Sequence, residues 1–274
     1  MVLPRLAEGG RDASPSARQT GSMPRVATGE SVLSRAVRIF AAFSATQPSL
    51  TVTEVARLSG LHLATTSRLI AELVQHELLE RTGDGRVRIG MRMWELAQRA
   101  SPALPLREAA MPYLEDLHDV IGHHVQLGVL DGRDVLFVER LSAPGAVINI
   151  TQIAGRLPLH ASSSGVVLLA FGPPELREGV LSQPMQRFTR HTITEPRRLR
   201  EVLADVRRVG HVINKGHIHP DATGIAVPVW GGNGGVIAAL SAVVPNDDHA
   251  FAMVPVLKAA ARGIARCLAS PRGR

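Results

Sequence analysis

The stretch HASSSGVVLLAFG, residues 160–172, places three serines and a glycine directly before an apolar run. The Ser164 hydroxyl could act as a nucleophile, with His160 as the nearest base in the sequence. Such catalysis also needs an orienting acid, and the stretch lacks the Gly-x-Ser-x-Gly pattern of a nucleophile elbow. Alternatively, the apolar run is a helix whose first N–H groups, around Ser163 and Ser164, bind a small anion. The missing elbow and acid favour this second interpretation, and we predict no enzymatic activity.

The stretch HIHPD, residues 217–221, is a second candidate for chemistry. In an extended segment His217 and His219 would point the same way, and Asp221 could supply a third metal ligand. A His-x-His pair is weakly specific, and histidines in loops are more often solvated. We therefore predict no metal and no cofactor, and keep the three residues only as weak metal candidates.

A winged helix-turn-helix is predicted before these sites, within residues 30–90. Thr51 and Glu54 have capping-box spacing, which indicates a helix start, and Gly60 is placed to end that helix. A second helix is expected from about Leu63 to Gln75. The stretch TGDGR, residues 82–86, then predicts a tight hairpin.

The second helix of such a pair enters the major groove of DNA, and the hairpin reaches the neighbouring backbone or the minor groove. Hydroxyl and guanidinium groups suit phosphates and base edges. The predicted DNA contacts are Thr65, Thr66, Ser67 and Arg68 on the helix, with Arg81, Arg86 and Arg88 on the wing. The alternative is a helical module for protein contacts with a solvated arginine face.

The composition sets the class of protein. The 274 residues carry a net charge of +7, and Lys215 and Lys258 are the only lysines, so the excess is almost all arginine. Arginine suits phosphate binding, although it also replaces lysine in GC-rich genomes. A single cysteine, Cys267, favours a reducing, cytoplasmic setting, and no apolar run reaches the roughly 18 residues that cross a bilayer. We therefore expect no membrane partner.

The rest of the chain predicts an α+β protein of two domains. Residues 1–29 are expected to be a disordered arm, residues 91–105 a linker helix, and residues 106–270 a second domain. That domain should hold a largely antiparallel sheet flanked by helices, because its strands come in hairpins. Strands are expected at 124–141, at AVINITQ (146–152), at 211–215 and over 223–244, with helices at 163–171, 196–209 and 248–268.

Residues 31–268 resemble the IclR family of bacterial transcriptional regulators. The resemblance rests on LTVTEVARLSGLHLATTSRLIAELVQHELLER in the first domain. In the second it rests on GRLPLHASSSGVVLLA and RRVGHVINKGHIHPDATGIAVPVWGGNGGVIAALSAVVP. It implies a homodimer, often paired into a tetramer, that binds a palindromic operator on double-stranded DNA. It also implies a GAF-like effector domain that binds a small molecule, through the backbone of Ser163 and Ser164 and through Asn214, Gly224, Ser241 and Val243.

The chain departs from the family pattern at several of these positions. Asn214 stands where an aspartate is common, Gly224 where a cysteine or serine is common, and Val243 where a serine is common. His217 replaces a common glutamate. We therefore predict a roomier, less polar pocket for a larger effector, such as an aromatic or substituted carboxylic acid.

The recognition helix departs as well, since residues 62–64, His-Leu-Ala, lack the usual hydroxyl cap. Thr65 or Thr66 is then expected to cap the helix one turn later. A repressor is the default expectation. The departure leaves open a ligand-binding module that no longer binds DNA.

Overall fold

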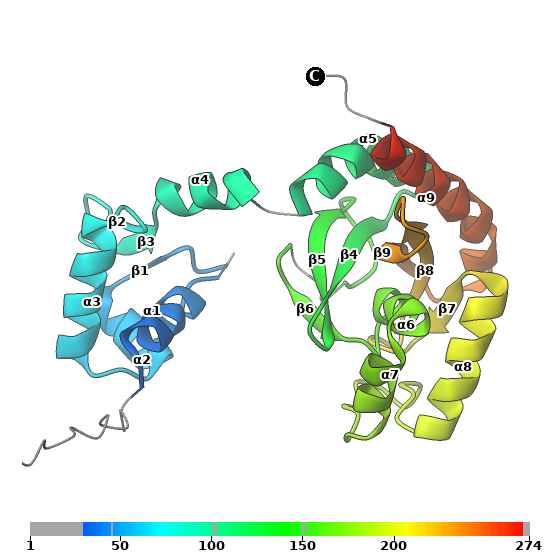
Figure 1. Cartoon of the computed structure of the whole chain (residues 1–274), viewed down its shortest axis with the longest axis horizontal. Helices are drawn as coiled ribbons and strands as arrows, with labels where there is room; N and C mark the ends of the chain where they lie inside the picture. The colour runs from blue at the N-terminus through cyan, green and yellow to red at the C-terminus, as the bar shows by residue number, and fades with distance from the viewer. Residues whose placement is uncertain (1–29, 45, 101–102, 150, 152, 271–274) are drawn as a thin grey trace, which may run out of the picture. The chain divides into compact units, whose positions relative to one another are not determined.

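The computed structural model describes residues 30–44, 46–100, 103–149, 151 and 153–270. The chain divides into two compact units between Arg99 and Ala100, and Figure 1 shows the elements of each. The arm predicted over residues 1–29 lies outside the described residues. The two units are described separately below.

The N-terminal unit is a winged helix-turn-helix. Its elements are α1 (Val32–Ala41), β1 (Ser49–Leu50), α2 (Val52–Ser59), α3 (Leu63–Gln75), β2 (Leu79–Arg81), β3 (Val87–Ile89) and α4 (Met91–Ala100). The predicted capping box forms: Thr51 Oγ1 accepts from the Glu54 N–H, and the Glu54 carboxylate accepts from the Thr51 N–H. Gly60 ends α2 in the left-handed conformation, as predicted. The second helix has the predicted bounds.

One apolar cluster holds this unit together. Ile39 of α1, Val55 of α2, Ile70 of α3 and Val87 of β3 are fully buried in it. The three strands pair antiparallel in the order β1-β3-β2, so the predicted hairpin forms the wing. Three helices and a small sheet therefore share one core, and the wing is fixed to it through Val87.

The C-terminal unit is built on a six-stranded antiparallel sheet of order β6-β5-β4-β9-β8-β7. Its strands are β4 (His124–Asp131), β5 (Asp134–Leu141), β6 (Arg156–Pro158), β7 (Val212–Lys215), β8 (Ala222–Trp230) and β9 (Val236–Pro245). Its helices are α5 (Ala103–Ile121), α6 (Ser163–Phe171), α7 (Pro174–Leu181), α8 (Pro196–Val209), the short η1 (Asp248–Ala252) and α9 (Met253–Ala269). No helix in the described part of the chain combines the length and the apolar character needed to span a membrane.

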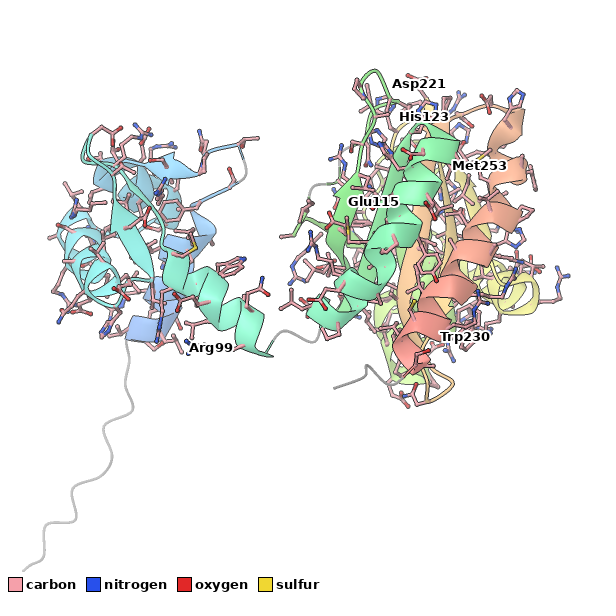
Figure 2. All side chains as sticks on the ribbon, turned by 90° about the horizontal axis from the view of Figure 1, so that it is seen from above. Arg99, Glu115, His123, Asp221, Trp230 and Met253 are labelled. Carbon is pink, nitrogen blue, oxygen red and sulfur yellow. The ribbon has the colours of Figure 1, made fainter. Side chains whose placement is uncertain are left out.

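Helices cover both faces of this sheet (Figure 1). Helices α5 and α9 lie side by side on one face, and Figure 2 shows them from that side. Helices α6, α7 and α8 pack on the other face. Because both faces are covered, side chains that point to either face of β8 and β9 are buried. This agrees with the nearly continuous apolar sequences of the two strands.

Helix α6 lies against the sheet because both surfaces permit a close approach. The residues of α6 from Ser163 to Ala170 are all buried, as expected of a helix that is apolar all round. The facing sheet positions are small: a Cβ on Gly224 would lie 2.8 Å from Ser163 Oγ. A Cβ on Gly128 would lie 3.5 Å from Ser164 Cβ. Glycine at these positions therefore lets the start of α6 approach the strands.

The strand predicted at AVINITQ is wrong. Its described residues, 146–149 and 151, are in no strand, and β6 follows instead at residues 156–158. The pattern of β-branched residues misled the prediction, because Ile148 is 58% exposed rather than buried on a sheet face. The described part of this segment is a loop, and its Val147 carbonyl is hydrogen-bonded to His124 Nε2 at 2.6 Å.

Candidate functional site: an effector cavity and a DNA-binding surface

Three predicted site residues meet in one row across the sheet. Asn214 of β7 pairs with Gly224 of β8, and Gly224 pairs with Val243 of β9. Residues that pair directly across antiparallel strands point to the same face. Since a Cβ on Gly224 would meet Ser163, this row faces the start of α6. Strand register thus brings together residues that lie far apart in the sequence.

A second row, two residues along the strands, holds Ser241 and Gln126, which are paired between β9 and β4. Ser164 Oγ donates to Ser241 Oγ at 2.8 Å, and both residues are about 1% exposed. Ser241 does not line the cavity described below, whereas Ser164 and Gln126 do. Ser241 therefore holds the Ser164 side chain by a hydrogen bond without lining the cavity itself.

The start of α6 presents free backbone donors. Ser162 caps the helix: its Oγ accepts from the Gly165 N–H at 3.0 Å, and its carbonyl accepts from the Val166 N–H at 2.9 Å. Within the described residues, the N–H groups of Ser163 and Ser164 find no acceptor. Two adjacent N–H groups at the positive end of a buried helix have the chemistry that suits an anion.

A cavity opens at this helix start. The space between its lining atoms is about 470 Å³, open solvent at its mouth included, and about 50 Å³ of it can hold the centre of a water molecule. Five of the six predicted effector residues line it: Ser163, Ser164, Asn214, Gly224 and Val243. Apolar side chains from other elements complete the wall, among them Phe137, Ile148, Leu157 and Ile218. The cavity thus combines apolar walls with a polar end.

Unpartnered side-chain nitrogens gather at the same cavity. Four buried side-chain nitrogens in the described part of the chain have no hydrogen-bond partner: Asn149 Nδ2, Asn214 Nδ2, His217 Nδ1 and His123 Nδ1. The first three belong to residues that line the cavity. A buried polar atom without a partner costs free energy, so such a cluster points to a ligand that supplies the missing partners.

Among these residues, the backbone of His217 is held in place by a hydrogen bond. Its carbonyl accepts from Thr192 Oγ1 at 2.6 Å, and Thr192 is 4% exposed. Burial, with a smaller contribution from nearby His191, lowers the pKa of His217 to about 4. The ring is therefore neutral at pH 7.

The nucleophile hypothesis for Ser164 has no geometric support. Its hydroxyl proton is directed to Ser241, and the only hydrogen bond of the His160 ring within the described residues runs from Nε2 to the Gln186 carbonyl, at 2.8 Å. Burial lowers the pKa of His160, and no acid in the described structure orients its ring. The geometry around the serines therefore gives no support to a catalytic role.

The premise of the metal hypothesis is wrong. Residues 217–219 form bends and not an extended segment. His217 and His219 both line the cavity, whereas the Asp221 side chain is 83% exposed and lies 3.9 Å from His219 Nδ1. Within the described residues, no three histidine, cysteine or acidic side chains are grouped so as to hold a metal ion.

In the N-terminal unit, α3 presents part of the predicted DNA-binding set. Ser67 and Arg68 are exposed and Thr65 is half-buried. The outward position predicted for Thr66 is wrong, because Thr66 is fully buried and its Oγ1 donates to the His62 carbonyl at 3.1 Å. At the 3.6-residue period, Thr66 shares the inner face with Leu69 and Ile70.

The cap predicted one turn into the helix is also wrong. Helix α3 begins at Leu63, and its N-cap residue, His62, makes no side-chain cap hydrogen bond. Leu63 is 53% exposed at this end. The first turn of the helix therefore presents uncapped N–H groups and an apolar side chain.

The three wing arginines differ in their partners. Arg86 donates to the Ser49 carbonyl at 2.8 Å and to Glu54 at 3.1 Å. Arg88 pairs with Glu80 on the neighbouring strand. The Arg81 side chain is exposed and has no hydrogen bond or ion pair within the described residues. Arg86 therefore fixes the wing to α2, whereas Arg81 is free to meet a phosphate.

The sequence interpretation missed the part of the cavity wall formed by Ile148, Asn149 and Thr151. Thr151 Oγ1 donates to Asn149 Oδ1 at 2.7 Å and accepts from Gln126 Nε2, which leaves Asn149 Nδ2 facing no partner in the described structure. One feature could have found Gln126: it is the single amide in the mainly apolar strand HVQLGVL. The sequence of the loop that contains Asn149 and Thr151 shows no comparable feature.

A winged helix-turn-helix, followed by a domain with a donor-lined cavity, defines a DNA-binding regulator that responds to a small molecule. Residues 32–83 match the IclR helix-turn-helix domain, and residues 98–267 match the model described as bacterial transcriptional regulator IclR C-terminal. The chain belongs to the IclR family of transcriptional regulators, which binds DNA and small-molecule effectors and is not a family of enzymes.

Several relatives cover most of the chain. A crystal structure of an IclR homologue from Microbacterium hydrocarbonoxydans, complexed with 4-hydroxybenzoate, is 46% identical, with a TM-score of 0.84 over 88% of this chain and 100% of that one. An IclR homologue from Microbacterium sp. strain HM58-2 is 44% identical, with a TM-score of 0.60 over 89% of this chain and 100% of that one. The Escherichia coli regulator XynR is 31% identical over 76% of this chain and 83% of its own.

Proposed function

We propose that the chain is a cytoplasmic repressor, acting as a homodimer or a pair of dimers, whose binding to a palindromic operator is controlled by an aromatic carboxylic acid. Residues 30–90 bind DNA, with Arg68 and Arg81 as phosphate or base contacts. Residues 91–105 connect them to the effector domain, residues 106–270. The lone cysteine, Cys267, is consistent with a reducing compartment.

One observation carries the choice of effector class: the cavity joins apolar walls to a cluster of donors at the start of α6. A carboxylate accepts hydrogen bonds and carries charge, so it suits the N–H groups of Ser163 and Ser164 together with Asn214 Nδ2. An aromatic ring suits Phe137, Leu157 and the apolar remainder of the wall. The relative at 46% identity was crystallised with such a molecule, 4-hydroxybenzoate.

The regulatory mechanism we infer is a two-state linkage. The acid binds one arrangement of the dimer more tightly, and the helical connection around Trp94 passes this bias to the two recognition helices. Trp94 is 59% exposed in the single chain, so it is available for contacts with a partner chain.

Calorimetric titration tests the effector class. We expect 4-hydroxybenzoate and benzoate to bind saturably, and glyoxylate and pyruvate to bind weakly, since a two- or three-carbon acid leaves the apolar wall uncovered. Tight binding of glyoxylate or pyruvate, with no heat from the aromatic acids, would refute the proposal.

A second candidate function, a ligand-binding module without DNA binding, is favoured by the uncapped start of α3. Titration of the protein onto a labelled fragment from upstream of its own gene, against scrambled DNA at several salt concentrations, separates the two. Binding that prefers the native fragment and weakens steeply with salt supports the regulator. Weak and equal binding to both fragments would favour the module.

A further inference from the structure

We propose that His217 recognises a hydroxyl group on the aromatic effector, so that this residue makes the cavity select hydroxylated acids over unsubstituted ones. The inference rests on the proposed function, because it assigns one part of the same cavity to one part of the ligand. It starts from the different hydrogen-bonding capacities of the unpartnered atoms around the cavity.

Two of the three unpartnered cavity atoms, Asn149 Nδ2 and Asn214 Nδ2, belong to amide NH₂ groups and can only donate. The backbone N–H groups of Ser163 and Ser164 also only donate. A carboxylate only accepts, so these groups satisfy the acid end of a ligand. They cannot accept the proton of a ligand hydroxyl.

The third atom, His217 Nδ1, is different in kind. A neutral imidazole has one N–H donor and one acceptor nitrogen, and a phenolic hydroxyl is likewise both a donor and an acceptor. Because burial keeps the pKa of His217 at about 4, the ring is neutral at pH 7 and offers no cation to a carboxylate. The complementary ligand group is therefore an uncharged hydroxyl.

The backbone that carries this ring is held in place by hydrogen bonds. Thr192 Oγ1 donates to the His217 carbonyl at 2.6 Å, and Thr189 Oγ1 donates to the preceding Gly216 carbonyl at 2.6 Å. Thr192 in turn accepts from the N–H groups of Phe188 and Thr189. The loop at 188–192 thus fixes the backbone of His217 beside the cavity.

A site built to pair a hydroxyl discriminates strongly against an analogue that lacks it, because the buried partner is then left unsatisfied. We therefore expect the wild-type protein to bind 4-hydroxybenzoate roughly tenfold more tightly than benzoate, an order-of-magnitude value for one buried hydrogen bond. A ring that merely fills space would not produce this preference.

The experiment is calorimetric titration of both acids into the wild type, His217→Phe and His217→Gln. In His217→Phe, the affinity for 4-hydroxybenzoate should fall by roughly tenfold while that for benzoate stays within about twofold, which abolishes the preference. His217→Gln, which can both donate and accept, should restore part of it. Unchanged benzoate binding also shows that each variant is folded with an intact cavity.

His249→Gln is the matched control. It makes the same change of residue type outside the cavity, at a side chain that is 89% exposed. This variant should keep the wild-type preference. Equal losses for both acids in His217→Phe, or a preference that survives in it, would overturn the role of His217 and leave the proposed effector class standing. A wild-type protein that binds neither acid would overturn both.

Discussion

At the scale of single residues, the cavity depends on an absent side chain. Gly224 is a point where β8 passes close to α6, and its φ is not positive, so the backbone there would accept any residue. What excludes a side chain is space: a Cβ would lie 2.8 Å from Ser163 Oγ and 3.3 Å from Ser163 Cβ. Gly224 therefore sets both the position of Ser163 and the room beside it.

Gly224→Ala should lower the affinity for 4-hydroxybenzoate by roughly tenfold, because the new methyl group displaces Ser163 or fills the space that the carboxylate needs. Binding to DNA should be unchanged. Calorimetry and a DNA titration measure the two effects. Gly232→Ala is the control, since a Cβ there meets nothing within 4 Å. Equal effects of the two substitutions would contradict the role of Gly224 in making room for the ligand.

His217 also predicts a pH dependence of stability. Its pKa is about 4 in the folded protein, and a histidine in the unfolded chain titrates near 6.5. Between these values the unfolded state holds a proton that the folded state lacks. The free energy of unfolding should therefore fall as the pH drops from about 6.5 to about 4, by on the order of 3 kcal/mol from this residue alone.

Urea denaturation of the wild type and His217→Gln across a pH range from about 4 to about 8 measures this contribution. His124 and His160, whose pKa values burial also lowers, contribute equally to both proteins and cancel in the comparison. The wild type should lose more stability than the variant below a pH of about 6.5, and the two should change in parallel above that value. Parallel curves over the whole range would mean that the ring is not desolvated.

At the scale of elements, the wing combines two kinds of arginine. Arg86 bridges the Ser49 carbonyl and Glu54, the same carboxylate that closes the capping box of α2. Hydrogen bonds from Thr51, followed by the charge of Arg86, lower the pKa of Glu54. The wing, β1 and the start of α2 are thereby joined through one side chain. Arg81, by contrast, extends from the end of β2 without a side-chain partner in the described structure.

Substituting the two arginines should separate stability from DNA binding. Arg86→Ala should lower the stability of the N-terminal unit by about 1 kcal/mol, since it removes a half-exposed ion pair and a backbone hydrogen bond. Arg81→Ala should leave the melting temperature unchanged and reduce the slope of log affinity against log salt by about one, the loss of a single phosphate contact. Melting curves and salt-dependent DNA titrations provide the two readouts. If Arg81→Ala lowered the stability and Arg86→Ala reduced the salt dependence instead, Arg86 would be the phosphate contact and Arg81 the stabilising residue.

At the scale of the whole molecule, the function requires that two separate units influence each other. The effector cavity lies within the C-terminal unit, at the end of β8 that is close to Asp221 and far from Trp230 (Figure 2). The DNA-binding helix lies in the other unit. A regulator of this design works only if binding at one unit changes the free energy of binding at the other.

Linkage makes this requirement quantitative. If 4-hydroxybenzoate changes the affinity for operator DNA by some factor, the operator must change the affinity for 4-hydroxybenzoate by the same factor. Titrating the acid with and without saturating operator, and the operator with and without saturating acid, gives both factors independently. An effector affinity that is the same with and without operator would show that the units are not coupled.

Local patterns in the sequence determined the elements of this protein. The capping box at Thr51, the left-handed turn at Gly60, the apolar periods of α3 and α8 and the continuous apolar run of α6 act over a few residues, and the bounds of these helices follow from them. The hairpin at residues 82–86 is local in the same way. The serine stretch likewise predicts a helix start rich in free N–H groups, because capping is a property of adjacent residues.

The family resemblance named most residues of the site together, but only the tertiary structure gives the physical reason why they meet. The row from Asn214 through Gly224 to Val243 exists because strand register aligns them, and register depends on long-range pairing that no short window contains. The exposed loop at Ile148 has β-branched residues that are typical of a strand, and Thr66 has a hydroxyl group that is typical of a DNA contact. In the folded protein the loop at Ile148 is part of a cavity wall and Thr66 is a core residue. The reason is that burial depends on what packs opposite a side chain and not on the type of that side chain.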